Sequence, residues 1–313
     1  MALSCSCIGG GHPCLVVVWI LLALSPVHGS TGGRGDPKGC ASPSGFCDMN
    51  NSPGTAAAAF IQASKRMGNN MVESRDDLGS RDSAPVAENQ ARPCQCKASD
   101  ASWVLSNRTE PKCIFVDLGA ADGNTFAQFL ANDYGKLDSI CPGGAENWEA
   151  ILVEANPKFA GNMTALERLH PGKVRAFAKT AAYDCEAQIP FYLDLVNDAH
   201  NNWGSSIFAN HPDVIRSGRT TVSIPTVNVN RVLAETAIEG DVVLVKIDIE
   251  GAEWDIFPCM AQSEAIGKIN TVFIEIHPVR WSAQRTSEEE MREAIRRVVS
   301  KGVKIPAYRS PTL

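Results

Sequence analysis

A regular alternation of short apolar runs with segments of helical spacing constrains the fold of this chain more than any other feature. Each run has the length of a strand buried on both faces, and each intervening segment gathers its apolar residues on one helical face. The apolar runs lie at residues 114–118, 150–153, 174–178, 241–247 and 271–276, and the helical segments at 124–132, 156–169 and 287–300. We therefore predict an α/β fold with a mostly parallel twisted sheet and helices on both faces.

Two further segments, residues 188–193 and 220–229, alternate apolar and polar side chains. This pattern is typical of antiparallel strands that are buried on one face. A polar loop at 197–206 lies between them, and residues 303–308 would form at most an edge strand because Pro306 has no N–H group. Ligands bind at the carboxyl ends of strands in parallel sheets, so the residues that follow the apolar runs are the candidates for a site.

The first apolar run ends in a turn of small residues. Gly119 and Gly123 allow the backbone to approach a ligand closely, and the next helix offers its free N–H groups. A dinucleotide site would need glycine where Ala121 stands, and a pyrophosphate does not explain the carboxylate of Asp117. An acidic group suits a cation, and S-adenosylmethionine carries both an ammonium and a sulfonium group. The cofactor-binding candidates at this turn are Asp117, Gly119, Ala120, Ala121, Gly123 and Asn124.

Glu154 ends the second apolar run. A carboxylate at this place can accept hydrogen bonds from both hydroxyl groups of a ribose. It follows Gly119 by 35 residues (154 minus 119), against about 20 in the compact dinucleotide unit. We attribute the longer spacing to an insertion at 134–148, and we interpret Glu154 as a nucleoside ligand rather than a solvated loop residue.

Charged residues close the fourth apolar run. Lys246, Asp248 and Glu250 alternate, so they would project to one face if the strand continued. These charges could have a purely structural role, in which Lys246 forms an ion pair with Asp248 or Glu250, because unpaired charges at the end of a buried strand are costly. Asp248 is best placed to face a cofactor or an incoming hydroxyl, and His277, which follows Glu275 after the next run, is the second candidate for a general base. A metal ion at Asp248 would lack clear second and third ligands, so we predict no metal site.

These residues belong to longer stretches that follow one another in a recognisable order. The stretches are FVDLGAADGNTF (115–126), ILVEANP (151–157), KTAAYD (179–184), TVNVNRVL (226–233), VKIDIEGAEWDIF (245–257) and TVFIEIHP (271–278). From about residue 113 to residue 305 the chain resembles the FkbM family of S-adenosylmethionine-dependent methyltransferases. The Lys-x-Asp-x-Glu-Gly-x-Glu stretch is the most specific part of this resemblance.

The resemblance implies a Rossmann-like class I methyltransferase fold and transfer of a methyl group to a hydroxyl oxygen, often of a sugar or a secondary metabolite. It implies that the methionine part is held by Asp117, Gly119 and Gly123, the ribose by Glu154 and the adenine near Ala181 and Ala182. It also implies that Asp248 lies close to the methyl-transfer centre. Such folds usually finish with a hairpin of two strands, of which the end of this chain supplies at most one.

An unbroken apolar run of ten residues, 15–24, lies near the N-terminus. As a helix it would rise about 15 Å, half the thickness of the hydrocarbon core of a membrane. We predict a signal peptide at residues 1–29, with a short signal anchor as the alternative because no Lys or Arg precedes the run. Residues 30–99 are rich in Gly, Ser, Ala, Asn and Pro and predict a largely disordered linker, which leaves residues 100–313 as the methyltransferase domain.

Eleven cysteines are many for a cytosolic enzyme, and eight of them follow the predicted signal peptide. An even number in a secreted chain favours disulfides, although eight cysteines leave 105 full pairings open. Cys94 and Cys96 have no second Cys/His pair at metal-ligand spacing, so disulfides are the better interpretation there as well. Asn107 and Asn162 begin N-glycosylation sequons. We expect a glycoprotein of the secretory pathway, in the Golgi lumen or secreted, with membrane contact only if the N-terminal segment is an uncleaved anchor.

The formal net charge is −6 and no cluster of Lys or Arg stands out, which argues against nucleic acid as a partner. We expect an O-methyltransferase that acts on a hydroxyl of a glycan or small metabolite. The loop at 201–206 would cover this acceptor, and Trp203 would stack on a sugar face. The alternative is a catalytically inactive secreted binding or scaffold protein on the same fold.

Overall fold

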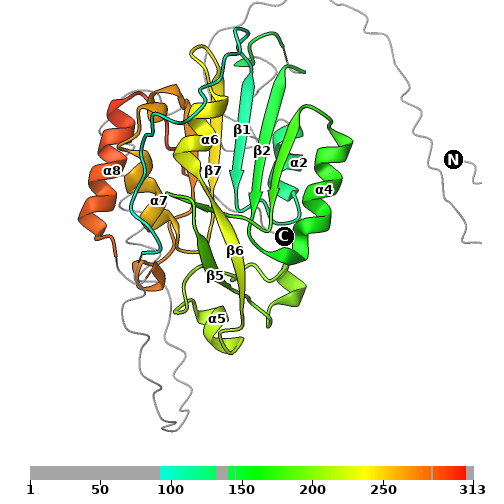
Figure 1. Cartoon of the computed structure of the whole chain (residues 1–313), viewed down its shortest axis with the longest axis vertical. Coiled ribbons are helices and arrows are strands. Elements are labelled where there is room, and N and C mark those ends of the chain that lie inside the picture. Colours follow the sequence, from blue (N-terminus) through cyan, green and yellow to red (C-terminus); the bar gives the residue numbers. More distant parts are fainter. Residues whose placement is uncertain (1–91, 132–139, 145, 283–284, 308–313) are drawn as a thin grey trace, which may run out of the picture. The chain divides into compact units, whose positions relative to one another are not determined.

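The structure is a computed structural model and describes residues 92–131, 140–144, 146–282 and 285–307. The predicted signal peptide and the predicted linker as far as residue 91 lie outside these described residues. A parallel sheet of five strands, in the order β3-β2-β1-β7-β8, forms the centre of the fold (Figure 1). Its strands are β1 (Cys113–Leu118), β2 (Trp148–Glu154), β3 (Val174–Ala178), β7 (Val242–Ile247) and β8 (Thr271–Ile274). The predicted α/β class is confirmed.

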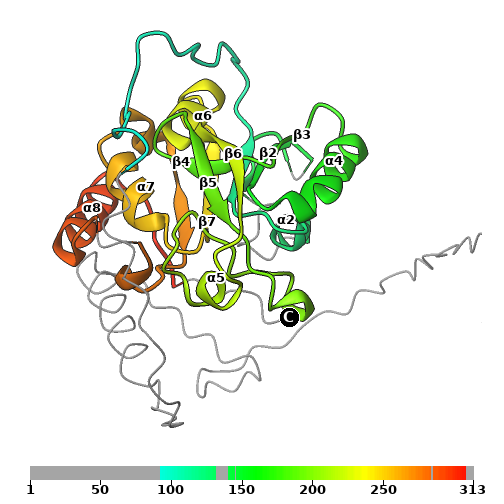
Figure 2. The same ribbon diagram turned by 60° about the horizontal axis from the view of Figure 1, so that its bottom comes forward.

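Helices cover both faces of this sheet, as predicted. Along β1, Ile114, Val116 and Leu118 belong to one apolar core, while Cys113 and Phe115 belong to another, because successive side chains of a strand point to opposite faces. The first core includes residues of α6 (Val229–Thr236), α7 (Glu253–Met260) and α8 (Glu288–Ser300). The second includes residues of α2 (Asn124–Leu130) and α4 (Ala160–Leu169). Figures 1 and 2 show these two groups of helices on either side of the sheet.

The order of the strands reverses at β1. From β1 the chain runs outward through β2 to β3, and it returns on the other side of β1 through β7 and β8. Two loops that leave the sheet in opposite directions open a crevice at such a point, beyond the carboxyl ends of the strands. The glycine turn after β1 and the charged stretch after β7 both lie there.

A second, smaller sheet has the order β4-β6-β5. It consists of β4 (Ala181–Tyr183), β5 (Gln188–Tyr192) and β6 (Thr221–Asn228), and β5 and β6 pair antiparallel, as the alternating sequence predicts. Figure 1 shows β5 and the short helix α5 (Pro212–Arg216) at the end of the molecule toward which β1 points. This layer therefore lies beside the carboxyl ends of the central strands.

Several predicted helices differ in detail from the observed ones. The segment at 156–169 divides into a short 3-10 helix, η1 (Pro157–Phe159), and α4, whereas α8 follows the predicted capping residue Ser287, which forms a capping box with Glu290. The remaining 3-10 helices are η2 (Asp198–His200), η3 (Glu264–Lys268) and η4 (Val279–Ser282). The edge strand expected at 303–308 is reduced, within the described residues, to one parallel bridge between Lys304 and Thr271.

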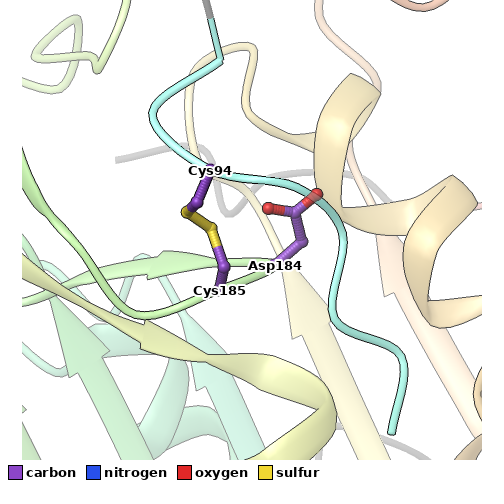
Figure 3. A group of neighbouring side chains, drawn as sticks. All are labelled: Cys94, Asp184 and Cys185. Carbon is purple, nitrogen blue, oxygen red and sulfur yellow. A yellow bond between two sulfur atoms is a disulfide. The ribbon is translucent and has the colours of Figure 1, made fainter.

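Among the residues that the structure describes, three pairs of cysteines form disulfides. Cys94 is joined to Cys185 and Cys96 to Cys259, with Cα atoms 6.3 Å and 5.7 Å apart, and the third pair is Cys113 and Cys141. Figure 3 shows the first pair beside the carboxylate of Asp184. The first disulfide attaches Cys94 to a residue just after β4, and the second attaches Cys96 to α7. The end of the predicted linker therefore contacts the domain.

Ionic contacts hold the same segment. Arg92 lies 2.9 Å from a carboxylate oxygen of Asp255 and 3.3 Å from one of Asp184. Farther along, Arg108 pairs with Asp241 at 2.6 Å, just before β7. The sequon residues Asn107 and Asn162 are both exposed. In the part of the chain that the structure describes, we find no helix with the length and hydrophobicity needed to span a bilayer.

Candidate active site

Two adjoining cavities lie at the carboxyl ends of β1, β2 and β7. The first, called the apolar cavity here, is lined by Glu154 and Asn156 and by hydrophobic residues that include Val153, Phe159, Ala181, Ala182, Phe191, Ile207 and Ala252. The second, called the charged cavity, has a volume of about 380 Å³ and is lined by residues that include Lys246, Asp248, Glu250, Glu275, His277 and His211. Both cavities are bordered by Gly119, Ala121, Asp248 and Glu250, so they meet at the turns that follow β1 and β7.

The turn after β1 needs glycine because the turn after β7 passes directly against it. Gly119 has a left-handed φ of 86°, and a Cβ atom there would overlap the carbonyl oxygen of Asp248. The N–H group of Asp248 donates to the carbonyl of Leu118 at 3.1 Å, which fixes this close approach. Gly123, with a φ of 93°, caps α2 and lies against the side chain of Leu166. The small residues of the turn thus bring two strand ends together at the cavities.

Glu154 lies at the end of β2 and is only 6% exposed, yet it borders the apolar cavity. Its carboxylate accepts hydrogen bonds from the backbone N–H groups of Ala121, at 2.7 Å, and of Asn156. Burial raises the pKa of Glu154 to about 7, although these hydrogen bonds and the charge of Lys246 act in the opposite direction. A carboxylate has about four acceptor positions, so it can accept further hydrogen bonds from a ligand.

Most of the other residues that line the apolar cavity are hydrophobic. Ala181 and Ala182, on β4, are buried and line the apolar cavity together with Phe159 and Phe191. A flat, weakly polar ring such as a purine suits a wall of this kind, which is the role that the sequence resemblance implies for the two alanines.

Asp117 does not reach either cavity. Its side chain is fully buried beneath the glycine turn, where it accepts a hydrogen bond from the hydroxyl of Thr125 and lies 3.3 Å from the ammonium group of Lys246. Burial raises the pKa of Asp117, while Lys246 opposes this shift. The predicted turn residues that border a cavity are Gly119, Ala121 and Asn124, and those that border neither are Asp117, Ala120 and Gly123.

Lys246 connects the two turns. Its ammonium group donates to the carbonyl of Gly119 at 2.6 Å and lies 3.6 Å from a carboxylate oxygen of Asp248. The ion pair with Asp248 is one of the two pairs that the sequence suggested. Together with the contact to Asp117, these bonds place one positive charge among the carboxylates at the strand ends.

His277 lies between three carboxylates. Its Nδ1 is 3.0 Å from Glu253, and its Nε2 is 3.3 Å from Glu250 and 3.9 Å from Asp248. Burial lowers the pKa of His277, but the charges of Glu250 and Glu253 outweigh burial and hold this pKa well above its ordinary value. At neutral pH the ring is therefore a positively charged imidazolium with both nitrogens protonated. It would have to release one proton before it could act as a base. Asp248, which borders both cavities, is the better placed of the two predicted bases.

Glu250 is the carboxylate that joins two histidines. Burial raises its pKa, but His277 and His211 outweigh burial and lower the pKa of Glu250 to about 2. Glu275 also lines the charged cavity, and burial together with the charge of Asp248 raises its pKa to about 7. The cavity therefore combines a firmly ionised carboxylate with one that titrates near neutrality.

Residues of the polar loop at 197–206 border both cavities. Lys158, in η1, donates to the side chain of Asn202 at 2.6 Å, and Asn201 donates to the carboxylate of Asp122 at 3.0 Å. Trp203 is 56% exposed, borders both cavities and stacks on His200 with 5.0 Å between ring centroids. A largely exposed indole that lines a cavity is available to a ligand.

Sequence reasoning did not single out His211, Trp281 or Glu253. His211 lies 3.0 Å from Glu250, and its ring contacts that of Trp281 with centroids 4.3 Å apart. The His-Pro-Asp sequence at 211–213 indicates the start of a helix, but nothing in it indicates a partner 39 residues away. Glu253 was visible as the last glutamate of the most specific stretch, and its buried contact with His277 gives that position a physical role.

A family model described as the Methyltransferase FkbM domain matches residues 117–301. No curated protein and no solved structure gives a match. The matched region begins near the end of β1, includes the residues that border both cavities and extends through α8, and it covers more than half of the chain. The chain therefore belongs to the FkbM family of methyltransferases.

Proposed function

We propose that this protein is an S-adenosylmethionine-dependent O-methyltransferase that acts on a hydroxyl group of a glycan or small metabolite in the secretory pathway. The observation that carries the proposal is the position of Glu154 in the apolar cavity, where its carboxylate accepts the N–H group of Ala121, a residue that borders both cavities. A nucleoside fits the first cavity, and a polar acceptor fits the second. Family membership supports the type of reaction.

The residues of the apolar cavity suit the nucleoside part of the cofactor. Glu154 would accept hydrogen bonds from the ribose hydroxyls, and Ala181 and Ala182 would contact the adenine ring. When bound, S-adenosylmethionine supplies an electrophilic methyl group on a sulfonium ion. The backbone at Gly119 and Ala121, which borders both cavities, would contact the part that extends toward the charged cavity.

The charged cavity suits a hydroxyl acceptor. Asp248 would accept the proton of the attacking hydroxyl, and its position at the junction of the cavities brings a base to the place where the two ligands meet. Trp203 would cover a sugar face. Its indole ring borders both cavities and stacks on His200.

Six cysteines in disulfides and two exposed sequon residues support a route through the secretory pathway, where disulfides persist. The acceptor is then a hydroxyl compound present in that compartment.

The test is methyl transfer by the full chain from S-adenosylmethionine with a deuterated methyl group to a panel of glycans and small hydroxyl compounds. Mass spectrometry should detect a deuterated methyl ether with the wild-type protein. Asp248→Asn should reduce turnover by about 100-fold or more, the usual contribution of a general base. Glu186→Gln, in an ion pair that borders neither cavity, is the control and should leave turnover unchanged. Failure of the wild-type protein to bind the cofactor and to label any acceptor would favour the inactive scaffold.

A further inference from the structure

The charged cavity contains more carboxylates than cations. Asp213, Asp248, Glu250 and Glu275 line it, while Lys246 is its one lysine or arginine among the described residues. Lys246 is already close to Gly119, Asp117 and Asp248. Carboxylates that lie close together do not by themselves show a binding site. The position of His277 between these carboxylates indicates what they can bind.

We propose that Asp248, Glu250 and His277 bind a divalent ion of the first transition series in the charged cavity. One ligand atom from each residue lies within 4.8 Å of the other two. Nε2 of His277 is 3.3 Å from an oxygen of Glu250 and 3.9 Å from an oxygen of Asp248. An ion that bonds nitrogen and oxygen at about 2.0–2.2 Å separates its ligand atoms by roughly 3–4 Å. The spacing of these atoms therefore fits one shared ion.

The contact between Glu253 and His277 also supports a metal site, because Glu253 is not one of the three proposed ligands and orients the ring of His277. Its carboxylate contacts Nδ1 of His277 at 3.0 Å, which leaves Nε2 directed at Asp248 and Glu250. Both oxygens of Glu253 also accept backbone N–H groups, those of Ile249 and Gly251, at 2.8 and 2.9 Å. A carboxylate that fixes one ring nitrogen while the other faces the ligand position is the usual support of a metal-binding histidine.

Glu250 is held in place as well. Its carbonyl accepts the hydroxyl of Ser206 at 2.7 Å, and its carboxylate is 3.0 Å from Nε2 of His211. Nδ1 of His211 accepts the N–H group of Asp213 at 3.2 Å, so Nε2 carries the proton that Glu250 accepts. The side chain of Glu250 is therefore positioned before an ion binds.

The other groups of potential ligand residues among the described residues are unsuitable. One contains Cys94, Asp184 and Cys185, and the other contains Cys96, Asp184 and Cys259. Their cysteines are joined as disulfides, which removes the thiolates that would bind an ion. Figure 3 shows the first of these groups. The cluster around His277 keeps all of its ligand atoms.

The donor atoms indicate the class of ion. Two carboxylates and one imidazole suit manganese, iron or zinc better than calcium or magnesium, which prefer oxygen ligands alone. Three protein ligands leave coordination positions open, as in catalytic metal sites. The inference about the ion's role rests on the proposed function: next to the junction of the cavities, the ion would bind the acceptor oxygen and lower the pKa of its hydroxyl group. The carboxylate oxygen of Asp248 that does not bind the ion would accept the proton that the hydroxyl group releases.

The test is a Mn²⁺ titration of the full chain after treatment with a chelator, without cofactor or acceptor. Loss of the free Mn²⁺ signal in electron paramagnetic resonance should reveal one site per chain. Asp248→Asn, Glu250→Gln and His277→Gln should each weaken binding at least tenfold. Asp213→Asn lines the same cavity outside the cluster and should change binding less than twofold.

A spectroscopic measurement separates coordination from loss of fold. Pulsed electron paramagnetic resonance of bound Mn²⁺ should detect a coupled imidazole nitrogen in the wild-type protein and in Asp213→Asn, and this coupling should disappear in His277→Gln. Absence of binding at millimolar Mn²⁺, or binding that all three cluster variants retain, would overturn the proposal. Calorimetry of S-adenosylmethionine in the presence of chelator tests the cofactor site separately, so either proposal can fail alone.

Discussion

Glu154 is the single residue on which the proposed cofactor site depends most. It lies almost fully buried at the end of β2, accepts two backbone hydrogen bonds and faces the apolar cavity. Its raised pKa of about 7 shows that burial dominates over these contacts. A ligand that donates hydroxyl groups to this carboxylate would stabilise the ionised form.

This balance predicts a pH-dependent affinity for S-adenosylmethionine. The ionised carboxylate accepts the ribose hydroxyls, so the dissociation constant should rise as the pH falls through about 7, by up to tenfold per pH unit. Glu154→Gln should weaken binding at pH 8 by about 1–3 kcal/mol and remove the dependence that Glu154 causes. Calorimetric titrations between pH 6 and pH 8 measure both effects.

Glu154→Gln is expected to weaken cofactor binding but not to lower the stability of the folded protein. The pKa of Glu154 rises from 4.5 to about 7 in the folded chain, so its ionisation opposes folding as the pH increases across that interval. Glu154→Gln should therefore not destabilise the protein at pH 8. A variant that binds the cofactor as tightly as the wild type would remove Glu154 from the ribose role.

The sequence predicted the position of Glu154 and Gly119 because both follow from the ends of strands in a parallel sheet. It did not predict the surroundings of Asp117. The register pairs Asp117 directly with Lys246 on the neighbouring strand, and this pairing between distant segments has no sequence pattern. The same limit explains why His211 was not identified, since its partner Glu250 comes from another part of the chain.

At the scale of elements, the contact between the turns after β1 and β7 positions the site.

The long strands and α8 could be predicted from the sequence, because apolar runs and a capping box are local features. The helices α6 and α7 were not, because each has 8 residues and α7 is buried along almost its whole length. A helix that is buried all round shows no amphipathic spacing, and Pro258 inside α7 argues against a helix.

Substitution of the glycine in the first turn should test this contact. Gly119→Ala would place a Cβ atom against the carbonyl of Asp248 at a φ of 86°, so we expect a loss of more than about 1 kcal/mol in the free energy of unfolding. Gly161→Ala, in α4, meets no atom within 4 Å and should stabilise the protein by about 0.5–1 kcal/mol. Denaturant unfolding of both variants measures the difference; equal stabilities would mean that the two turns do not contact each other as described.

At the scale of the whole molecule, disulfides connect segments that are far apart in the sequence. The bond between Cys96 and Cys259 spans 163 residues, and that between Cys94 and Cys185 spans 91. The sequence predicted disulfides but not their pairing, because connectivity depends on the folded geometry. It also predicted the linker as far as residue 99, whereas the contacts of Arg92 and Cys94 bring its last residues onto the domain.

Removal of one disulfide should measure the contribution of this attachment. The double variant Cys96→Ala with Cys259→Ala should lower the free energy of unfolding by about 2–5 kcal/mol, as loss of a native disulfide does in small secreted domains. Mass spectrometry of unreduced peptides from the wild-type protein should link Cys96 to Cys259 and Cys94 to Cys185. Peptides that link these cysteines differently, or an unchanged stability of the double variant, would contradict the proposed attachment.

The central claim is that the two cavities form the site of a methyltransferase that uses a sulfonium nucleoside. Isothermal titration calorimetry of the 313-residue chain with S-adenosylmethionine, with NADH as the comparison, tests it most directly. We predict saturable binding of one S-adenosylmethionine per chain, weakened in Glu154→Gln, and no binding of NADH. Binding of NADH in its place, or no heat of binding with S-adenosylmethionine, would contradict the account.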